Sequence, residues 1–328
     1  MLLAIDAGGT STRAVLLDTS GRAYGYGRGG AGNPTAVGIA SAADALVATA
    51  QHALAGSAAG STRPELAVIA MAGEKTAAFR EQVSSRLTAL GVREVVLSHD
   101  LLGVFHSGTS SSDGYTLIAG TGTVAARIRA GRLDKVAGGK GWLLGDGGGG
   151  FSIGHAVARA VVASLDAQGP DTALVDLVLG SMEIVTDIST SAGRAEALRQ
   201  LVSAIYAQPP IALADLAPLA FVAHQDPVAR PILVSASAAL ANLLSAVRAV
   251  DLPGPVVVGG SVLIRGFLNA PPSLQAELVL PAGGEPVIPV PDGLVGAAVL
   301  ALRHAGCDVD EALFHIIQAE VTRLAGYR

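Results

Sequence analysis

Short apolar runs that end in glycine-rich or polar turns open the chain. Leu2–Ile5 is apolar and stops at Asp6-Ala7-Gly8-Gly9-Thr10, and Ala14–Leu17 resumes the apolar pattern. A Ser20-Gly21 turn then leads into Arg22–Tyr26. Apolar runs of this length between turn residues predict three consecutive strands joined by a glycine turn and a second turn.

The same unit returns later in the chain. Tyr115–Ala119 is apolar, Gly120-Thr121-Gly122-Thr123 interrupts it, and Val124–Ile128 resumes it. An Ala130-Gly131 turn and Leu133–Val136 follow. Two copies of one unit indicate an internal duplication, so we expect two related lobes that each present a phosphate-sized glycine loop.

Helical and strand patterns alternate after each unit, which predicts the α/β class. The further strands are expected at Leu66–Met71, Val95–Ser98 and Pro255–Val258. The helices are expected at Ser41–Ala55, Lys75–Leu90, Ser152–Ser164, Ala195–Ala207 and Pro231–Ala249.

A chain of 328 residues exceeds what one hydrophobic core usually supports. We expect an N-terminal lobe over residues 1–112 and a C-terminal lobe over residues 113–309, with the hinge at Ser107–Asp113. Asp310–Leu324 has an apolar face and predicts a helix, so we expect residues 310–328 to pack back onto the N-terminal lobe.

The charge balance excludes some partners. The formal net charge is -5, and Lys and Arg are scattered, so nucleic acid is not an expected partner. The single Cys307 rules out an internal disulfide and a cysteine-based metal site within one chain, which fits a reducing compartment. The first residues lack the basic and apolar regions of a signal peptide, and the uncharged Pro231–Val247 contains several polar residues, so we expect a cytoplasmic protein without a membrane anchor.

The first glycine loop carries candidate chemistry. Gly8 and Gly9 allow backbone N–H groups to approach phosphate oxygens, and Thr10, Ser11 and Thr12 add hydroxyl donors. Asp6 ends the preceding strand, where a carboxylate is suitably placed to hold Mg²⁺. The alternative is a plain β-hairpin with a solvent-facing Asp6.

The second loop, Gly120-Thr121-Gly122-Thr123, lies at the matching point of the repeated unit, which strengthens the phosphate-binding interpretation of both loops. The chain has no P-loop sequence. Its one Gly-x-Gly-x-x-Gly match, Gly25 to Gly30, leads into Ala31-Gly32-Asn33-Pro34 instead of a helix, which argues against a dinucleotide-binding fold.

Asp100 directly follows a predicted strand, and ligands of open α/β sheets bind beyond the carboxyl ends of strands. It is therefore the candidate general base, which would accept the proton of an acceptor hydroxyl during phosphoryl transfer. The alternative is that Asp100 caps a helix starting near Leu101. His99 and His106 are expected to be helix-entry or surface histidines rather than catalytic ones.

Two further glycine-rich segments follow. Gly138 to Gly150 brackets the only tryptophan, Trp142, and the carboxylate of Asp146, which suggests a backbone-lined pocket for ring hydroxyls; a flexible surface loop is the alternative. Gly259-Gly260-Ser261 follows a predicted strand and is of the kind that lets a nucleoside lie against backbone. A simple turn between strand and helix is the alternative there.

With these motifs in order, nearly the whole chain resembles the sugar-kinase branch of the actin and hexokinase superfamily. Within it, the chain is similar to the BadF/BadG/BcrA/BcrD-type ATPase family, which contains N-acetylglucosamine kinases and bacterial glucosamine kinases. The resemblance implies two actin-like, ribonuclease H-like lobes, each a mixed sheet flanked by helices, with a cleft for ATP and sugar between them. It also implies Mg²⁺ as the cofactor, a homodimer, and small-molecule partners only.

The resemblance implies roles for individual residues. Asp6 to Thr10, with Ser11, would form the first phosphate motif, with Asp6 on the metal; Gly120 to Thr123 would form the second; Gly259, Gly260 and Ser261 would form the adenosine motif. Asp100 lies at the position of the family's catalytic base. The expected sugar contacts are Asn33, Asp100, Gly122, Trp142 and Asp146.

One departure concerns the sugar side of the cleft. The family commonly reads Gly-Asp-Glu-Gly-Ser, whereas Gly147 and Gly149 replace the Glu and the Ser here. Losing a carboxylate and a hydroxyl changes how the protein recognises the anomeric and C2 substituents of the sugar. Together with the resemblance of the chain as a whole, these two replacements favour a glucosamine kinase that phosphorylates the 6-hydroxyl. N-acetylglucosamine is the second candidate substrate.

Two other classes remain open. A conformational ATPase, like the family's activators of radical dehydratases, would hold an iron–sulfur cluster with more than one cysteine per chain, and only Cys307 is present. A non-enzymatic regulator would carry a DNA-binding domain or basic arm, and the sequence has neither.

Overall fold

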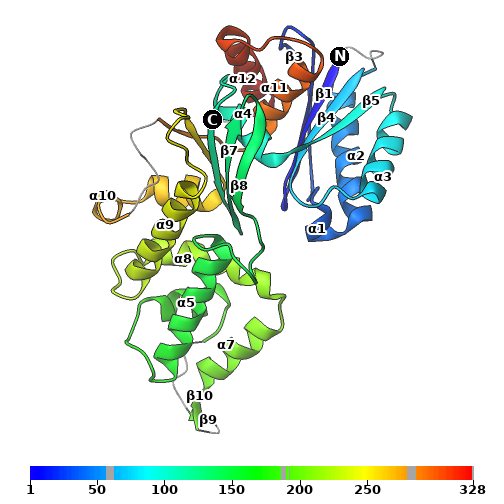
Figure 1. The fold of residues 1–328 in the computed structure, drawn as a ribbon. Coiled ribbons are helices and arrows are strands. Elements are labelled where there is room, and N and C mark those ends of the chain that lie inside the picture. Colours follow the sequence, from blue (N-terminus) through cyan, green and yellow to red (C-terminus); the bar gives the residue numbers. More distant parts are fainter. Residues whose placement is uncertain (57–62, 186–189, 192, 279–285, 327–328) are drawn as a thin grey trace.

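The chain folds into two lobes, each built on a mixed β-sheet (Figure 1). The computed structural model describes residues 1–56, 63–185, 190–191, 193–278 and 286–326. Over these residues there are two five-stranded sheets and one short two-stranded ribbon. The predicted α/β class, with mixed sheets flanked by helices, is confirmed.

The sheet of the first lobe has the strand order β3-β2-β1-β4-β5. Its first strand is antiparallel to the second, which is antiparallel to the third, while the first, fourth and fifth are parallel. The strands are β1 (Leu2–Ala7), β2 (Thr12–Leu17), β3 (Ala23–Gly29), β4 (Leu66–Met71) and β5 (Glu94–His99).

The sheet of the second lobe repeats this topology, with the order β12-β11-β6-β7-β8 and the same alternation of directions. The predicted duplication is thus present in the strand pairing. The strands are β6 (Gly114–Ala119), β7 (Thr123–Arg129), β8 (Arg132–Gly138), β11 (Val256–Gly259) and β12 (Val287–Pro289), and the short ribbon is β9 (Thr190–Ser191) with β10 (Arg194–Ala195).

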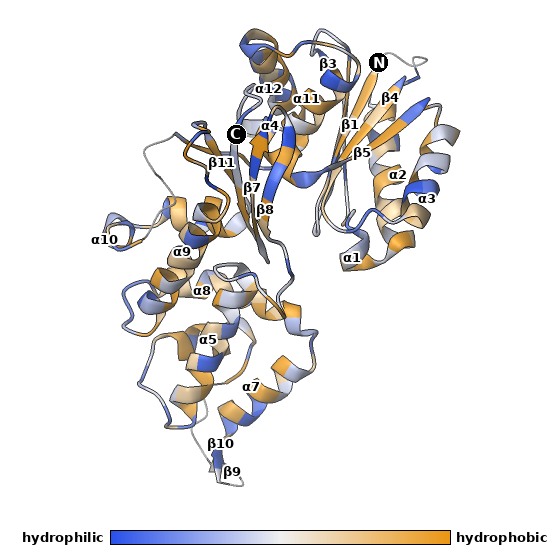
Figure 2. Cartoon of the chain, viewed as in Figure 1, coloured by the Kyte–Doolittle hydropathy of each residue, from blue (hydrophilic) through white to orange (hydrophobic). Residues whose placement is uncertain are grey.

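The helices of the first lobe lie on both faces of its sheet. One layer contains α1 (Pro34–Val37), α2 (Ile39–Ala55) and α3 (Ala77–Ala89), and the other contains α11 (Leu294–His304) and α12 (Glu311–Ala325). Every residue of β1 and β4 is buried between these layers. Figure 2 shows the hydrophobic colour running through both strands, as expected for strands covered on two faces.

The second lobe carries its helices in a separate group below its sheet (Figure 1). Buried residues of β6 and β11 join those of several of these helices in one hydrophobic core. The helical segments are α5 (Gly150–Leu165), α6 (Leu174–Ser181), α7 (Glu196–Tyr206), the 3₁₀ helix η1 (Pro210–Leu216), α8 (Ala217–Val222), α9 (Ala229–Ser245), the π-helix η2 (Val262–Gly266), the 3₁₀ helix η3 (Phe267–Asn269) and α10 (Pro272–Gln275).

The chain crosses between the lobes twice. The first crossing is α4 (Asp100–Gly108), which leads from β5 towards β6 and overlaps the expected hinge, Ser107–Asp113, only at Ser107 and Gly108. The second lies between β12 and α11, and it was not predicted. Because α11 packs its buried residues with those of β1 and β4, the structure assigns it to the first lobe, which differs from the expected C-terminal lobe over 113–309.

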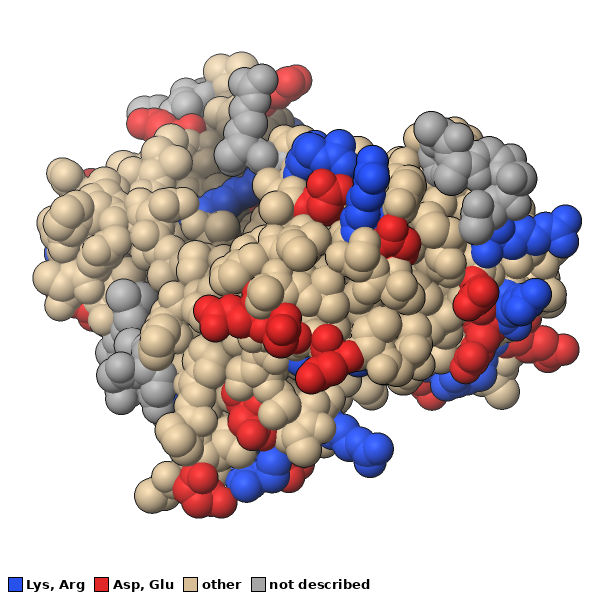
Figure 3. All heavy atoms as spheres, turned by 90° about the horizontal axis from the view of Figure 1, so that it is seen from above, with Lys and Arg blue, Asp and Glu red and all other residues tan. Residues whose placement is uncertain are grey.

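The helix α12 lies against the first lobe, as drawn in Figure 1, with Phe314, Ile317 and Val321 buried in the same core as Leu2 and Leu17. Over the described part of the chain, no helix combines the length and the apolar character that crossing a membrane requires. On the face shown in Figure 3, Lys and Arg lie scattered among Asp and Glu.

Candidate active site

A cleft of about 1070 Å³ separates the two lobes. It is lined by both glycine loops and by three carboxylates that the sequence singled out. The predicted site residues on its walls are Asp6, Gly8, Gly9, Thr10, Ser11, Asn33, Asp100, Gly120, Thr121, Gly122, Thr123, Asp146, Gly260 and Ser261. Residues far apart in the sequence are therefore brought to one cleft.

The first glycine loop is a tight turn between β1 and β2. The Gly8 amide donates to the Ser11 carbonyl at 3.0 Å, which closes the turn. A Cβ added to Gly9 would meet open space, so the loop tip is accessible to a ligand. Thr12 does not serve as a donor to the cleft, contrary to expectation, because it is fully buried and its hydroxyl donates to the Gly30 carbonyl at 2.8 Å.

The second glycine loop is held by the start of α5. The Gly150 amide donates to the Gly120 carbonyl at 2.7 Å, and the Phe151 amide to the Thr121 carbonyl at 3.0 Å. A Cβ on Gly149 would lie 2.8 Å from the Thr121 carbonyl oxygen. A serine at position 149 has no room in this arrangement, which gives a physical reason for one of the departures from the family pattern.

Asp6 lies at the base of the cleft and is 8% exposed. Its Oδ2 accepts a hydrogen bond from the Gly293 amide at 3.2 Å, at the N-terminus of α11, and lies 3.9 Å from Arg13. Burial, and then the charge of Asp292, raises the pKa of Asp6 to about 7, whereas Arg13 and the Gly293 amide lower it.

A carboxylate of this kind fits Mg²⁺. Within the described residues no three His, Cys, Asp or Glu side chains gather into a metal-binding group. Mg²⁺ that arrives with nucleotide phosphates needs only one or two protein carboxylates, because phosphate and water supply the other ligands. Asp6, beside a loop whose backbone faces the cleft, matches that requirement.

Asp100 occupies the first turn of α4, on the same side of the cleft as Asp6. The helix N-cap position belongs to His99, so the capping alternative for Asp100 is wrong, although its Oδ1 does accept from the Leu101 amide at 2.9 Å. Burial raises the pKa of Asp100, while that amide and the charge of Lys75 lower it.

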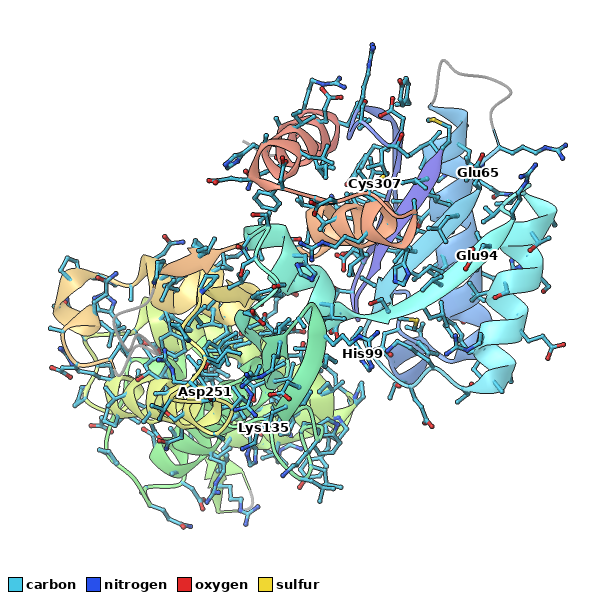
Figure 4. All side chains as sticks on the ribbon, turned by 45° about the horizontal axis from the view of Figure 1, so that its top comes forward. Glu65, Glu94, His99, Lys135, Asp251 and Cys307 are labelled. Carbon is cyan, nitrogen blue, oxygen red and sulfur yellow. The ribbon has the colours of Figure 1, made fainter. Side chains whose placement is uncertain are left out.

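His99 and Lys75 form a pair beside Asp100. Lys75 Nζ lies 3.2 Å from His99 Nδ1. Burial lowers the pKa of both side chains. Figure 4 shows His99 at the end of β5, on the side of the first lobe that faces the second. His106 lies neither at the surface nor at the helix entry, contrary to expectation: it is fully buried near the end of α4 and contacts Arg303 at 3.2 Å.

The two expected sugar contacts differ in their local bonding. Asn33 caps α1, because its Oδ1 accepts a hydrogen bond from the Thr35 amide at 2.9 Å. Its NH₂ group is therefore the group that can donate a hydrogen bond to a ligand. Asp146 is 8% exposed, has a left-handed backbone with φ of 62°, and its Oδ1 has no hydrogen-bond partner among the described residues. A buried carboxylate oxygen in this state is suited to accept a ligand hydroxyl.

Two predicted contacts do not line the cleft. Trp142 is 37% exposed and packs on Phe151, with ring centroids 4.9 Å apart. Its neighbours Leu143 and Leu144 are exposed, so this part of the loop matches the surface-loop alternative. Gly259 ends β11 and faces Val104, while Gly260, with φ of 91°, and Ser261 reach the cleft.

Sequence reasoning missed several residues of the cleft. Arg13 pairs with Asp6 across β1 and β2, and Lys140 and Arg265 line the wall of the second lobe. From the second crossing, the Gly293 amide donates to Asp6, and Asp292, which does not itself line the cleft, pairs with Arg13. A signal was present for this crossing, because Pro291-Asp292-Gly293 follows an apolar run in the same way as Asp6 and its glycines follow Leu2–Ile5.

The model of the BadF/BadG/BcrA/BcrD ATPase family matches residues 3–301. The chain belongs to the BadF/BadG/BcrA/BcrD ATPase family. This confirms the predicted resemblance.

A curated relative is the N-acetyl-D-glucosamine kinase of Dictyostelium discoideum, which is 29% identical over 219 residues. The match covers 63% of this member of the BadF/BadG/BcrA/BcrD family and 65% of the relative, so the chain spans less than two thirds of that relative's own length.

Solved structures show the same fold. A proposed N-acetylglucosamine kinase from Chromobacterium violaceum has a TM-score of 0.69 at 24% identity, covering 92% of this chain and 98% of that one. A ROK family glucokinase from Streptomyces griseus, in complex with glucose and AMPPNP, has a TM-score of 0.52 at 20% identity, covering 92% and 99%. The expected two-lobed, actin-like architecture of this family member is therefore confirmed.

Proposed function

We propose that the protein is an ATP-dependent amino-sugar kinase that transfers the γ-phosphate to the 6-hydroxyl of D-glucosamine. The observation that carries this is the meeting of two glycine loops, Asp6, Asp100 and Asp146 in one cleft. Phosphoryl transfer to a sugar requires backbone N–H donors for the phosphates, a carboxylate that holds the metal, a general base, and a group that accepts a hydrogen bond from a sugar hydroxyl.

The nucleotide half of the proposed site consists of the two loops and Gly260-Ser261. Gly8 to Ser11 and Gly120 to Thr123 would donate backbone and hydroxyl hydrogen bonds to the phosphates. Asp6 would hold Mg²⁺, which with ATP bound neutralises part of the phosphate charge. Gly260 and Ser261 would lie beside the adenosine, with Gly259 behind them.

The acceptor half consists of Asp100, Asn33, Asp146 and the Gly122 backbone. The raised pKa of Asp100 makes it a stronger base than an ordinary aspartate, suited to take the proton of the 6-hydroxyl. Asn33 would donate from its NH₂ group, and Asp146 Oδ1 would accept from a ring hydroxyl. Closure of the lobes would exclude water and so limit ATP hydrolysis.

N-acetylglucosamine is the second candidate acceptor, and the names of the relatives favour it. The walls of the cleft carry four acidic side chains against three basic ones, a small acidic excess that favours a cationic acceptor only slightly. The acidic ones are Asp6, Glu74, Asp100 and Asp146, and the basic ones are Arg13, Lys140 and Arg265. Gly147 and Gly149, in place of a Glu and a Ser, also change this side of the cleft. The homodimer and the cytoplasmic, reducing setting remain predictions.

The test is ADP release with Mg-ATP and, in turn, glucosamine, N-acetylglucosamine, glucose or no sugar. We expect fast release with glucosamine and little without sugar. Fast release with N-acetylglucosamine alone would establish the second candidate. Release that no sugar changes would contradict a sugar kinase and favour the conformational ATPase.

A further inference from the structure

The turn that connects β12 to α11 reaches the base of the cleft from the second lobe. It contains Asp292, whose side chain is 6% exposed and does not line the cleft. Resting on the proposed function, we propose that Asp292 is a positioning residue that holds the Arg13 guanidinium away from Asp6 and so keeps the Asp6 carboxylate available to the Mg²⁺ of Mg-ATP.

The distances around Arg13 support this. Arg13 stands opposite Asp6 in the register of β1 and β2, so it is the nearest cation to that carboxylate in the sheet. Its Nε lies 3.1 Å from Asp292 Oδ2, whereas its Nη1 lies 3.9 Å from Asp6 Oδ2. Both are ion-pair distances, and the contact with Asp292 is the closer of the two.

The N-terminus of α11 fixes both carboxylates. The Leu294 amide donates to Asp292 Oδ1 at 3.0 Å, and the Gly293 amide donates to Asp6 Oδ2 at 3.2 Å. A helix N-terminus stabilises negative charge, which explains how two acidic side chains are accommodated here with a single guanidinium between them. The same short turn therefore orients Asp6 directly and Arg13 through Asp292.

A direct role of Asp292 on a ligand does not fit its location. Asp6, Arg13 and Pro291 reach the cleft surface, while Asp292 lies behind Arg13. The charge of Asp292 also acts on Asp6 directly and raises the pKa of Asp6, so removing this charge would by itself favour metal binding. Through the guanidinium the effect has the opposite sign, because without the Asp292 charge Arg13 loses its closer ion pair and is drawn towards Asp6.

The experiment measures ATP binding by calorimetry with Mg²⁺ and with EDTA, for the full chain without any sugar. The ratio of the two affinities reports the contribution of the metal and does not depend on which acceptor is used. For Asp292→Asn we expect this ratio to fall by about 10- to 100-fold, the usual effect of changing a partner of a metal ligand. Binding in EDTA should change little.

A double variant separates this role from simple loss of structure. In Arg13→Gln/Asp292→Asn the guanidinium that would occupy Asp6 is also gone, so the ratio should recover most of its loss. Asp44→Asn is the matched control, since it removes the acid of the Arg86–Asp44 pair on the outside of the same lobe, and it should leave the ratio unchanged.

The outcomes are distinct from those of the kinase test. A wild-type ratio in Asp292→Asn, or a double variant no better than the single one, overturns the positioning role even if the protein phosphorylates an amino sugar. If Asp292→Asn does not fold, the double variant is measured instead. A ratio of ATP affinities with Mg²⁺ and with EDTA near that of the wild type supports the proposal. A tenfold or greater loss of this ratio, the scale expected when a partner of a metal ligand is changed, contradicts it.

Discussion

The two lobes place chemically different residues at equivalent positions of a duplicated unit. In the first lobe Ala7 pairs with Thr12 across the glycine loop, and in the second Ala119 pairs with Thr123 in the same way. One step earlier the first lobe has Asp6 opposite Arg13, whereas the second has Ile118 opposite Val124. The strand pairing is shared, but the charged pair is present in one lobe only.

This difference divides the work of the cleft. The first lobe supplies two carboxylates near its strand ends, the buried Asp6 and the half-buried Asp100, which are held by α11 and α4. The second lobe supplies mainly backbone, from Gly120 to Thr123 and the glycines after β8, together with Asp146. A duplicated fold can therefore keep its strand pairing in both copies while only one copy carries an acidic and a basic residue opposite each other beside the glycine loop.

The largest expected effect is that of removing the proposed base from the first lobe. For Asp100→Asn we expect phosphoryl transfer to the acceptor to fall by about 10²- to 10⁴-fold, the usual contribution of a general base, with ATP affinity nearly unchanged. Steady-state kinetics and calorimetry on the same preparation measure both. An equal loss of turnover and of ATP binding would remove Asp100 from this role.

The glycine loops offer a direct contrast between the lobes. In Gly122→Ala the new Cβ would clash with the Asp146 carboxylate, so we expect a loss of about 1–3 kcal/mol in unfolding free energy as well as activity. In Gly9→Ala the Cβ meets open space, so stability should change by less than about 0.5 kcal/mol while Mg-ATP affinity falls.

Denaturant unfolding and nucleotide binding of both glycine variants test this contrast. Equal stability of the two variants would mean that the second loop adapts to a side chain. Unchanged Mg-ATP affinity in Gly9→Ala would place the phosphates away from the first loop.

The buried charge of Asp6 predicts a dependence of stability on pH. Because the pKa of Asp6 is raised from 3.8 to about 7, its contribution is fully present below the lower value and is lost as the pH rises through the upper one. In the absence of ATP and Mg²⁺, Asp6→Asn should therefore gain stability relative to the wild type as the pH rises from about 4 to about 7, and the difference should level off above that range. Thermal unfolding over a pH series measures this, and parallel profiles for the two proteins would contradict it.

The smallest effect is expected at Trp142. Since its ring packs on Phe151 outside the cleft wall, Trp142→Ala should leave the KM for the sugar within about twofold and cost some stability through lost packing. A large rise in the KM for the sugar would contradict this and indicate that Trp142 contacts the sugar when the lobes close.

The duplicated strands and both loops could be predicted because their signals are local: apolar runs of strand length and glycines that end them. The helix α11 could not, since it is buried on nearly all sides and its sequence has no polar stripe to give a helical period. Its assignment to the first lobe depends on a crossing of the chain after β12, where Pro291-Asp292-Gly293 indicates a turn but not that the chain changes lobes.

The charged part of the site was predicted only in pieces. Asp6 and Asp100 follow strands and were found, but the contact of Asp292 with Arg13 joins opposite ends of the chain. Trp142 was expected to require burial, and the Phe151 ring beside it covers it only in part. Thr12 was counted as a phosphate donor because a hydroxyl next to a glycine loop gives no sign that the Gly30 carbonyl already binds it.

The most direct test of the central claim is the coupling of ATP use to sugar phosphorylation. The measurement is the amount of sugar phosphate formed for each ADP released with glucosamine as acceptor, with the phosphorylated position assigned by NMR. We expect one molecule of glucosamine 6-phosphate for each ADP released. ADP released without a phosphorylated sugar, with any amino sugar supplied, would contradict it.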